Sequence, residues 1–133
     1  MNKQDQSREL GTYWLEKAKE SFQSAELEYS QGYLSFSVNR LYYAVFYAVS
    51  AAIASRGLKY GRHSAVRASL HRDFIKAGIA SEDMGKLFDR LFYDRNKADY
   101  AAFTSFDPEI VREEIEQVKG FIAQFEDILN RGH

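Results

Sequence analysis

The hydrophobic pattern is strongest between Leu41 and Ala54, where only Ser50 interrupts an apolar run. A helix needs about 20 apolar residues to cross a bilayer, so this run is too short to do so. It is also longer than an ordinary strand. The pattern therefore predicts a helix over residues 35–55 that is apolar on nearly all sides and is buried at the centre of the domain.

A first helix is predicted before this central one, over about residues 7–31. Its apolar residues recur at helical spacing and are Leu10, Trp14, Ala18, Ser21 or Phe22, and Ala25. Gly32 is a plausible stop, so the first and central helices should be antiparallel neighbours. Residues 1–6 are polar and are expected to be frayed.

Three helices are predicted after the central one. Ser64 is suited to cap a third helix that ends near Gly78, with Val66, Leu70 and Phe74 facing inward. Ser81 is suited to cap a fourth helix. Asp107 followed by Pro108 is a strong start signal for the last helix. The apolar seam of that helix comprises Val111, Ile115, Val118, Ile122, Phe125 and Leu129.

The whole pattern predicts one all-α domain over residues 1–133, an antiparallel up-and-down bundle of four to five helices. The composition agrees, because the chain is 45% hydrophobic and 15% aromatic and has a single Pro. The chain has no Cys, which excludes disulfides, thiolate metal sites and a Cys nucleophile. Neither a leader peptide nor a membrane span is evident, so a cytoplasmic protein without cofactor or metal is expected.

Charge is unevenly distributed along a chain whose net charge is −1. Residues 56–76 hold six Lys or Arg against one Asp, whereas residues 107–127 hold seven acids against two basic residues. The basic run could follow a phosphate backbone, with Tyr60 available for stacking. Two other uses stay open, namely a solvated face and docking on an acidic partner, including the last helix of another copy.

The fourth helix has an apolar stripe that ends in charged residues. Its members are Met84, Phe88, Leu91, Arg95 and Asp99. Charges on such a stripe must be paired, line a cleft or lie at an interface. Arg95 and Asp99 are one turn apart and can pair with each other. The alternatives are a ligand site and a structural ion pair, which would include Arg40 if that side chain enters the core.

Three stretches of the chain, taken in order, resemble the HEPN superfamily and its small stand-alone prokaryotic proteins. They read NRLYYAVFYAVSAAIASRG, GRHSAV and FYDRNKADY. The resemblance covers about residues 10–129 and implies a helical bundle that usually dimerises. It also implies a link to ribonuclease toxins that pair with a minimal nucleotidyltransferase. Those toxins place an Arg-x4–6-His motif at the dimer interface, where two motifs form one site for RNA cleavage.

This chain departs from that motif. Arg95 and Asn96 match its start, but Tyr100 or Ala101 stands where the His belongs. Histidine suits metal-independent RNA cleavage because its pKa is near 6.5. Tyr and Asp, with reference pKa values near 10 and 3.9, are poor replacements for it. The departure argues against ribonuclease activity, while Arg95 keeps the chemistry needed to bind phosphate.

His63 is the histidine that matches the family stretch GRHSAV. It either approaches Arg95, within one chain or across a dimer, or is a loop histidine that bonds to backbone. Three hypotheses follow. The first is a homodimeric nucleotide- or RNA-binding protein of a toxin–antitoxin-like system. The second is a weak ribonuclease, and the third is an interaction module for a nucleotidyltransferase-domain partner.

Each hypothesis assigns residues. Ligand binding is assigned to Arg40 and Arg95 on phosphate and to Tyr43 and Tyr100 on base or sugar, with Asn96 and Arg62 as further ligand-binding residues. The ribonuclease hypothesis assigns the catalytic roles to Arg95, Asp99, Tyr100 and His63.

Overall fold

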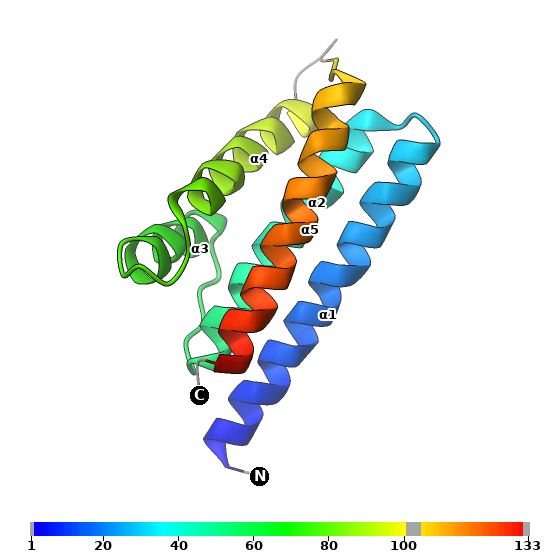
Figure 1. Cartoon of the computed structure of the whole chain (residues 1–133). Coiled ribbons are helices and arrows are strands. Elements are labelled where there is room, and N and C mark those ends of the chain that lie inside the picture. Colours follow the sequence, from blue (N-terminus) through cyan, green and yellow to red (C-terminus); the bar gives the residue numbers. More distant parts are fainter. Residues whose placement is uncertain (1, 101–104, 132–133) are drawn as a thin grey trace.

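The structure, a computed structural model, describes residues 2–100 and 105–131 (Figure 1). In that part of the chain it has five α-helices and one π-helical segment, and no strand. The elements are α1 (Lys3–Ser30), α2 (Leu34–Ser55), α3 (His63–Ser69), η1 (Leu70–Ile75), α4 (Glu82–Tyr100) and α5 (Pro108–Arg131). The predicted all-α bundle is confirmed.

α2 is the centre of the bundle, as its apolar pattern predicts. It contacts α1, α4 and α5, and it has more buried residues than α1 or α5. α1 and α2 are antiparallel neighbours joined by a tight turn at Gly32, whose φ is 82°. The long helices α1, α2 and α5 pack side by side (Figure 1).

Small residues bring α1 close to α2. A Cβ added at Gly11 of α1 would lie 3.1 Å from the backbone oxygen of Ala51 and 3.2 Å from Cβ of Ser55. A larger side chain here would push the two helices apart. The predicted inner face of α1 is displaced at its start, since Leu10 is 44% exposed whereas Gly11 is buried.

The N-terminal end of α1 also differs from its prediction. Residues 3–6, which were expected to be frayed, are part of α1, because the helix begins at Lys3. The reason is a side-chain cap, in which the Asp5 N–H donates to Oδ1 of Asn2 at 2.8 Å. Asn at this position satisfies one of the backbone donors left free at a helix start.

The third predicted helix is present, but in two forms. Residues 63–69 are α-helical and residues 70–75 are π-helical, and Val66, Leu70 and Phe74 are buried as predicted. The helix begins at His63, with no side-chain cap from Ser64. η1 packs against α4 at Gly85, where an added Cβ would overlap Ile75 and lie 3.0 Å from Cε1 of His71.

The predicted caps of the last two helices are confirmed. The Met84 N–H donates to Oγ of Ser81 at 3.3 Å, and the Glu109 N–H donates to Oδ1 of Asp107 at 2.9 Å. α4 packs mainly on α2 and leans away from α5 (Figure 1). None of the described helices has the length and apolarity needed to cross a membrane.

One buried acid lies between α4 and α5. Glu114 of α5 has a side chain that is 2% exposed, and Nε of Arg90 on α4 donates to its Oε2 at 3.0 Å. Burial raises the pKa of the Glu114 carboxyl, and the contact with Arg90 opposes that rise. Arg90 also donates to the side-chain oxygen of Gln117 at 2.7 Å. These contacts bridge the two helices where they diverge.

Candidate functional site

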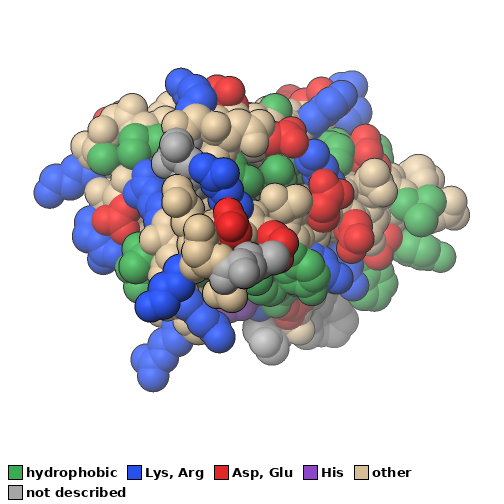
Figure 2. Space-filling model, turned by 90° about the horizontal axis from the view of Figure 1, so that it is seen from below, with side chains coloured by type: hydrophobic (Ala, Val, Ile, Leu, Met, Phe, Trp, Pro, Cys, Tyr) green, Lys and Arg blue, Asp and Glu red, His purple; other side chains and the backbone are tan. Residues whose placement is uncertain are grey.

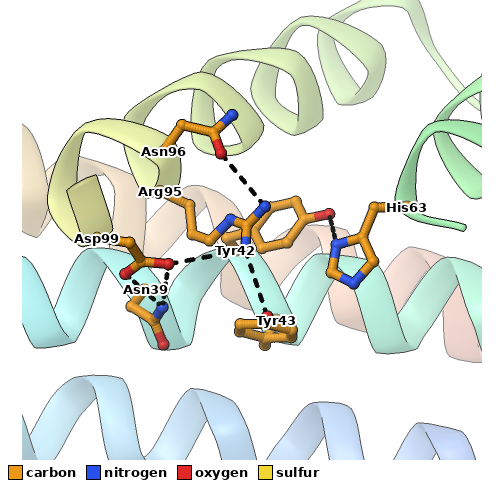
Figure 3. A network of polar contacts seen from close by, with 7 residues as sticks. All are labelled: Asn39, Tyr42, Tyr43, His63, Arg95, Asn96 and Asp99. Atoms are coloured by element: carbon orange, nitrogen blue, oxygen red, sulfur yellow. Dashed lines mark hydrogen bonds and ion pairs between the residues drawn. The ribbon is translucent and has the colours of Figure 1, made fainter. Parts of the chain in front are cut away.

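The candidate site lies where the second half of α4 crosses the first half of α2 (Figure 3). The apolar stripe of α4 is buried from Met84 to Leu91, as the spacing predicts. The next member of the stripe, Arg95, has a side chain that is only 14% exposed. The stripe therefore carries a guanidinium into a largely enclosed position.

Arg95 is enclosed but weakly paired. Its Nη1 lies 3.5 Å from the phenol oxygen of Tyr43 and 3.6 Å from Oδ2 of Asp99. Its Nη2 donates to Oδ1 of Asn96 at 3.3 Å, and its buried Nε has no hydrogen-bond partner among the described residues. Charge-assisted hydrogen bonds are usually about 2.7–2.9 Å long. The guanidinium therefore keeps donor capacity that its neighbours do not use.

Two tyrosines hold the guanidinium in place. Cζ of Arg95 lies 5.0 Å from the ring centroid of Tyr42 and 5.9 Å from that of Tyr43. A cation over an aromatic face is attracted by the ring quadrupole, and the attraction is larger where water is excluded. Tyr42 is fully buried, so its ring is fixed in position where it contacts the Arg95 guanidinium.

Asp99 completes the side of the cluster nearest the end of α4. It accepts a hydrogen bond of 3.0 Å from Nδ2 of Asn39 on α2. The expectation that Arg40 enters the core is wrong, because Arg40 is exposed. Neighbouring residues point about 100° apart around a helix, and the face of α2 that meets α4 carries Asn39. Asp99, at the charged end of the stripe, is thus joined to α2 by the side-chain amide of Asn39.

His63 is brought to the same cluster from the start of α3. Its Nδ1 lies 2.8 Å from the phenol oxygen of Tyr42, and its ring stacks on Phe46 with centroids 4.2 Å apart. Burial, and then the positive charge of Arg95, lower the pKa of His63 below 6.5. Burial raises the pKa of the Tyr42 phenol, so this pair is neutral near pH 7. His63 contacts side chains and is not a loop histidine bonded to backbone.

The structure gathers most, but not all, of the residues predicted for the site. Arg95, Asn96, Asp99, Tyr43 and His63 lie together (Figure 3). Arg62 is exposed at the position before α3. The side chain of Tyr100 lies outside the described residues.

Sequence reasoning missed Asn39 and Tyr42, which complete the cluster. The signal available was their i, i+3 spacing, which puts both on one face of α2.

The basic segment, residues 56–76, includes His63 of the cluster. All six Lys and Arg of residues 56–76 are exposed. Figure 2 shows Lys and Arg side chains gathered along the left of the end face, the side on which α3 lies in Figure 1. Two of the six are paired, because Arg67 contacts Asp89 at 2.7 Å and Arg72 contacts Asp73 at 2.9 Å. The positive excess is therefore smaller than the sequence suggests.

Comparison with known proteins gives one family and several relatives. A family model described as the HEPN domain matches residues 12–128. A Thermotoga maritima protein named "UPF0332 protein" is 36% identical over 117 residues, which are 88% of this chain and 89% of that protein. A Methanocaldococcus jannaschii protein named "Putative toxin" is 29% identical over 119 residues, 90% of this chain and 71% of that protein. Another from that organism, with the same designation, is 27% identical over 86 residues, 65% of this chain and 64% of that protein.

Proposed function

Because this chain belongs to the HEPN domain family, we propose that it is a homodimeric nucleotide- or RNA-binding component of a prokaryotic toxin–antitoxin-like system. Two relatives carry the name "Putative toxin", which supports the biological setting. Arg95 binds a phosphate group of the ligand, and Asn96 and Tyr43 are further contacts. Exposed Arg40 and Arg62 add positive charge on the solvent side.

The observation that carries this proposal is the weak pairing of Arg95. A mostly enclosed guanidinium that served only the fold would be expected to have a close carboxylate. Here the nearest carboxylate oxygen is 3.6 Å away, and Asp99 makes its shorter hydrogen bond to Asn39. Arginine presents its donors in a planar fork that matches phosphate oxygens. The two Nη atoms of Arg95, whose contacts with neighbouring side chains are 3.3–3.6 Å long, therefore fit a phosphate that approaches from solvent.

The test compares Arg95→Ala with the wild type in RNA binding and in stability. Fluorescence anisotropy of a labelled single-stranded RNA should show affinity lower by roughly 10- to 150-fold, the equivalent of losing one hydrogen bond to a charged group. The free energy of unfolding should fall by only about 1–2 kcal/mol, because the main loss is the cation–π contact. Arg112→Ala, at an exposed position on α5, is the matched control and should leave both quantities unchanged.

The opposite pattern would contradict the proposal. If Arg95 only fixes the fold, its removal should cost about 3–5 kcal/mol, as when one partner of a buried ion pair is lost. Unchanged RNA affinity together with such a loss would assign the cluster to stability.

A second candidate function, a weak metal-independent ribonuclease, is favoured by one observation. His63 is neutral near pH 7 and lies beside Tyr42, over whose ring Arg95 is held. In the tautomer whose Nδ1 donates to Tyr42, the Nε2 atom can accept a proton from an RNA 2′-hydroxyl. His63 would then supply the group that the family motif draws from its own histidine.

Cleavage of end-labelled RNA with the protein in excess tests this second candidate. His63→Asn should abolish any cleavage by the wild type, since asparagine has no group that titrates near neutral pH. Absence of cleavage by the wild type itself would remove the ribonuclease candidate and leave the binding proposal standing.

The homodimer is supported by an aromatic face on α2. Tyr43 and Tyr47 are only partly buried, and their ring centroids lie 5.7 Å apart. A half-covered aromatic face of this kind is typical of an interface. Light scattering should give about twice 15.4 kDa at micromolar concentration. A mass of one chain would contradict the dimer.

The family resemblance also supports a nucleotidyltransferase-domain protein as a second partner. Co-purification of that protein from its own operon is the measurement that checks it.

A further inference from the structure

A cavity of about 360 Å³ opens next to the candidate site. Its walls come from the first half of α1, the second half of α2, the 58–61 segment and the start of α3. The lining residues used below are Trp14, Phe46, Ser50, Lys59, Tyr60 and His63. This volume is near the lower end of the range for small-molecule sites, about 300–1,000 Å³, so the cavity suits a compact ligand.

The cavity is lined by aromatic rings that packing holds in place. Phe46 stacks on His63, and Trp14 stacks on Tyr47 with an interplanar angle of 23°. Tyr60 closes the side formed by the 58–61 segment, where its phenol oxygen accepts from Nη2 of Arg72 at 3.4 Å. Rings whose orientation is fixed before binding favour a flat, aromatic ligand, because little ordering of side chains is then required.

One residue, His63, belongs both to the lining of the cavity and to the Arg95 cluster. His63 lines the cavity, and its Nδ1 contacts Tyr42, the tyrosine whose ring lies beneath Arg95. The Nε2 atom of His63 remains as the ring nitrogen that a ligand can use. A molecule that extends from Arg95 past His63 therefore passes from a site for phosphate to a site for an aromatic ring.

The charge of the lining points to the same kind of ligand. Lys59 lines the cavity, and no Asp or Glu is among the described residues that line it. Ser50 adds a hydroxyl, which donates to the backbone oxygen of Phe46 at 2.8 Å and keeps its lone pairs as acceptors. An apolar cavity with one cation and a few polar atoms at its edge matches a base attached to a sugar phosphate.

We propose that this cavity holds one unpaired nucleobase of the RNA strand whose phosphate Arg95 binds. The chain then selects single-stranded over duplex RNA, because a paired and stacked base cannot enter the cavity. This inference rests on the RNA binding proposed above. An apolar side chain from a second copy is the other occupant that the lining would accept, and it would leave Lys59 and Nε2 of His63 without a partner.

Trp14 provides a direct readout, because it lines the cavity and is the only Trp in the chain. Three RNA probes of equal length are compared, namely a single strand, the same strand with abasic positions, and a duplex of the same sequence. Labelled-RNA anisotropy measures binding, and Trp14 fluorescence reports occupation of the cavity. The single strand should bind most tightly and should quench Trp14, whereas the abasic strand should bind without quenching.

A variant separates stacking from electrostatics. Tyr60→Leu keeps an apolar side chain but removes the ring, so affinity for the base-bearing strand should fall by roughly 5- to 150-fold, the loss expected for one stacked base. Its affinity for the abasic strand should not change. Tyr33→Leu is the matched control, since Tyr33 is an exposed tyrosine at the opposite end of α2. Equal melting temperatures of both variants and the wild type establish that the fold is kept.

The possible failures are distinguishable. In the first case RNA binds and Arg95→Ala weakens the binding, but the abasic and base-bearing strands bind with equal affinity. The base site is then wrong and the proposed function stands. If no RNA binds by anisotropy, the proposed function fails, and this inference fails with it. If Trp14 fluorescence changes with protein concentration and is then insensitive to RNA, a second copy fills the cavity and the base site is wrong.

Discussion

Tyr42 and His63 are joined through a contact of 2.8 Å between the phenol oxygen and Nδ1, which ties the start of α3 to the buried face of α2. The same tyrosine ring lies 5.0 Å from Cζ of Arg95. One fixed tyrosine therefore holds both residues, His63 at its hydroxyl and Arg95 over its ring. The protonation of the histidine must respond to the arginine, because the intervening ring does not screen charge as water does.

The first prediction concerns this coupling. Arg95→Ala should raise the pKa of His63 toward 6.5 without restoring it fully, since burial is the larger cause of the depression. Chemical shifts of the imidazole nitrogens in a pH titration measure it. Arg72→Ala, which alters an exposed arginine paired with Asp73, should leave the titration unchanged.

The lowered pKa of His63 also determines how the stability of the protein depends on pH. The folded protein binds the His63 proton less tightly than the unfolded chain does, so this residue lowers the free energy of unfolding as pH falls below about 6.5. His63→Asn should reduce that part of the acid sensitivity. An unaltered pH profile in this variant would contradict the lowered pKa.

The second prediction concerns the basic segment. Lys59 and Arg62 are exposed cations, and no ion pair involves them among the described residues. Replacing both by Gln should lower the slope of log affinity against log salt for single-stranded RNA by roughly 0.7 for each phosphate contact removed. Arg67→Gln is the control, because Arg67 is already bound to Asp89. An equal effect of the control would mean that the whole segment acts only as diffuse charge.

The helix boundaries and the inward faces were accessible from the sequence because they depend on local chemistry. Ser81 and Asp107 cap the helices that they were predicted to cap, and the stripe of α4 leads to Arg95. The partners of that arginine depend on how α4 crosses α2. One step along α2 turns a side chain by about 100°, so spacing alone could not decide between Asn39 and Arg40.

Contacts made by the connecting segments were less accessible. His63 meets Tyr42 because the 56–62 segment runs back along α2 to the start of α3, which no periodicity encodes (Figure 1). The π-helical form of η1 was missed as well, and η1 packs closely on Gly85 of the facing helix, a contact that local periodicity does not report.

The third prediction compares two helical glycines. An added Cβ at Gly120 of α5 meets nothing within 4 Å, so Gly120→Ala should raise the free energy of unfolding by up to about 1 kcal/mol. At Gly11 the added Cβ meets the backbone of α2, so Gly11→Ala should instead lower it by about 1 kcal/mol or more. Urea denaturation of the two variants measures both values. A gain of similar size at both positions would show that α1 can move away from α2 without cost.

The fourth prediction concerns Glu114. Its carboxyl has a pKa raised above 4.5 in the folded protein, so the folded state binds this proton more tightly than the unfolded chain, and stability is lost as pH rises through the folded pKa. Glu114→Gln keeps the side-chain volume and an acceptor for Arg90 but removes this loss. Relative to the wild type, the variant should become more stable as pH rises above 4.5, as thermal melting at several pH values can show. Glu113→Gln, at an exposed position on the same helix, should not change the pH profile.

The divergence of α4 from α5 has a consequence for local unfolding. α4 is attached to the bundle mainly through α2, whereas α1, α2 and α5 pack on one another. Native-state hydrogen exchange should therefore divide the chain into two cooperative units, with the amides of α3, η1 and α4 exchanging through smaller openings than those of the three long helices. Arg95 belongs to one unit, and Tyr42 and Tyr43 belong to the other. A ligand that contacts both would slow the exchange of α4 well beyond the residues it touches.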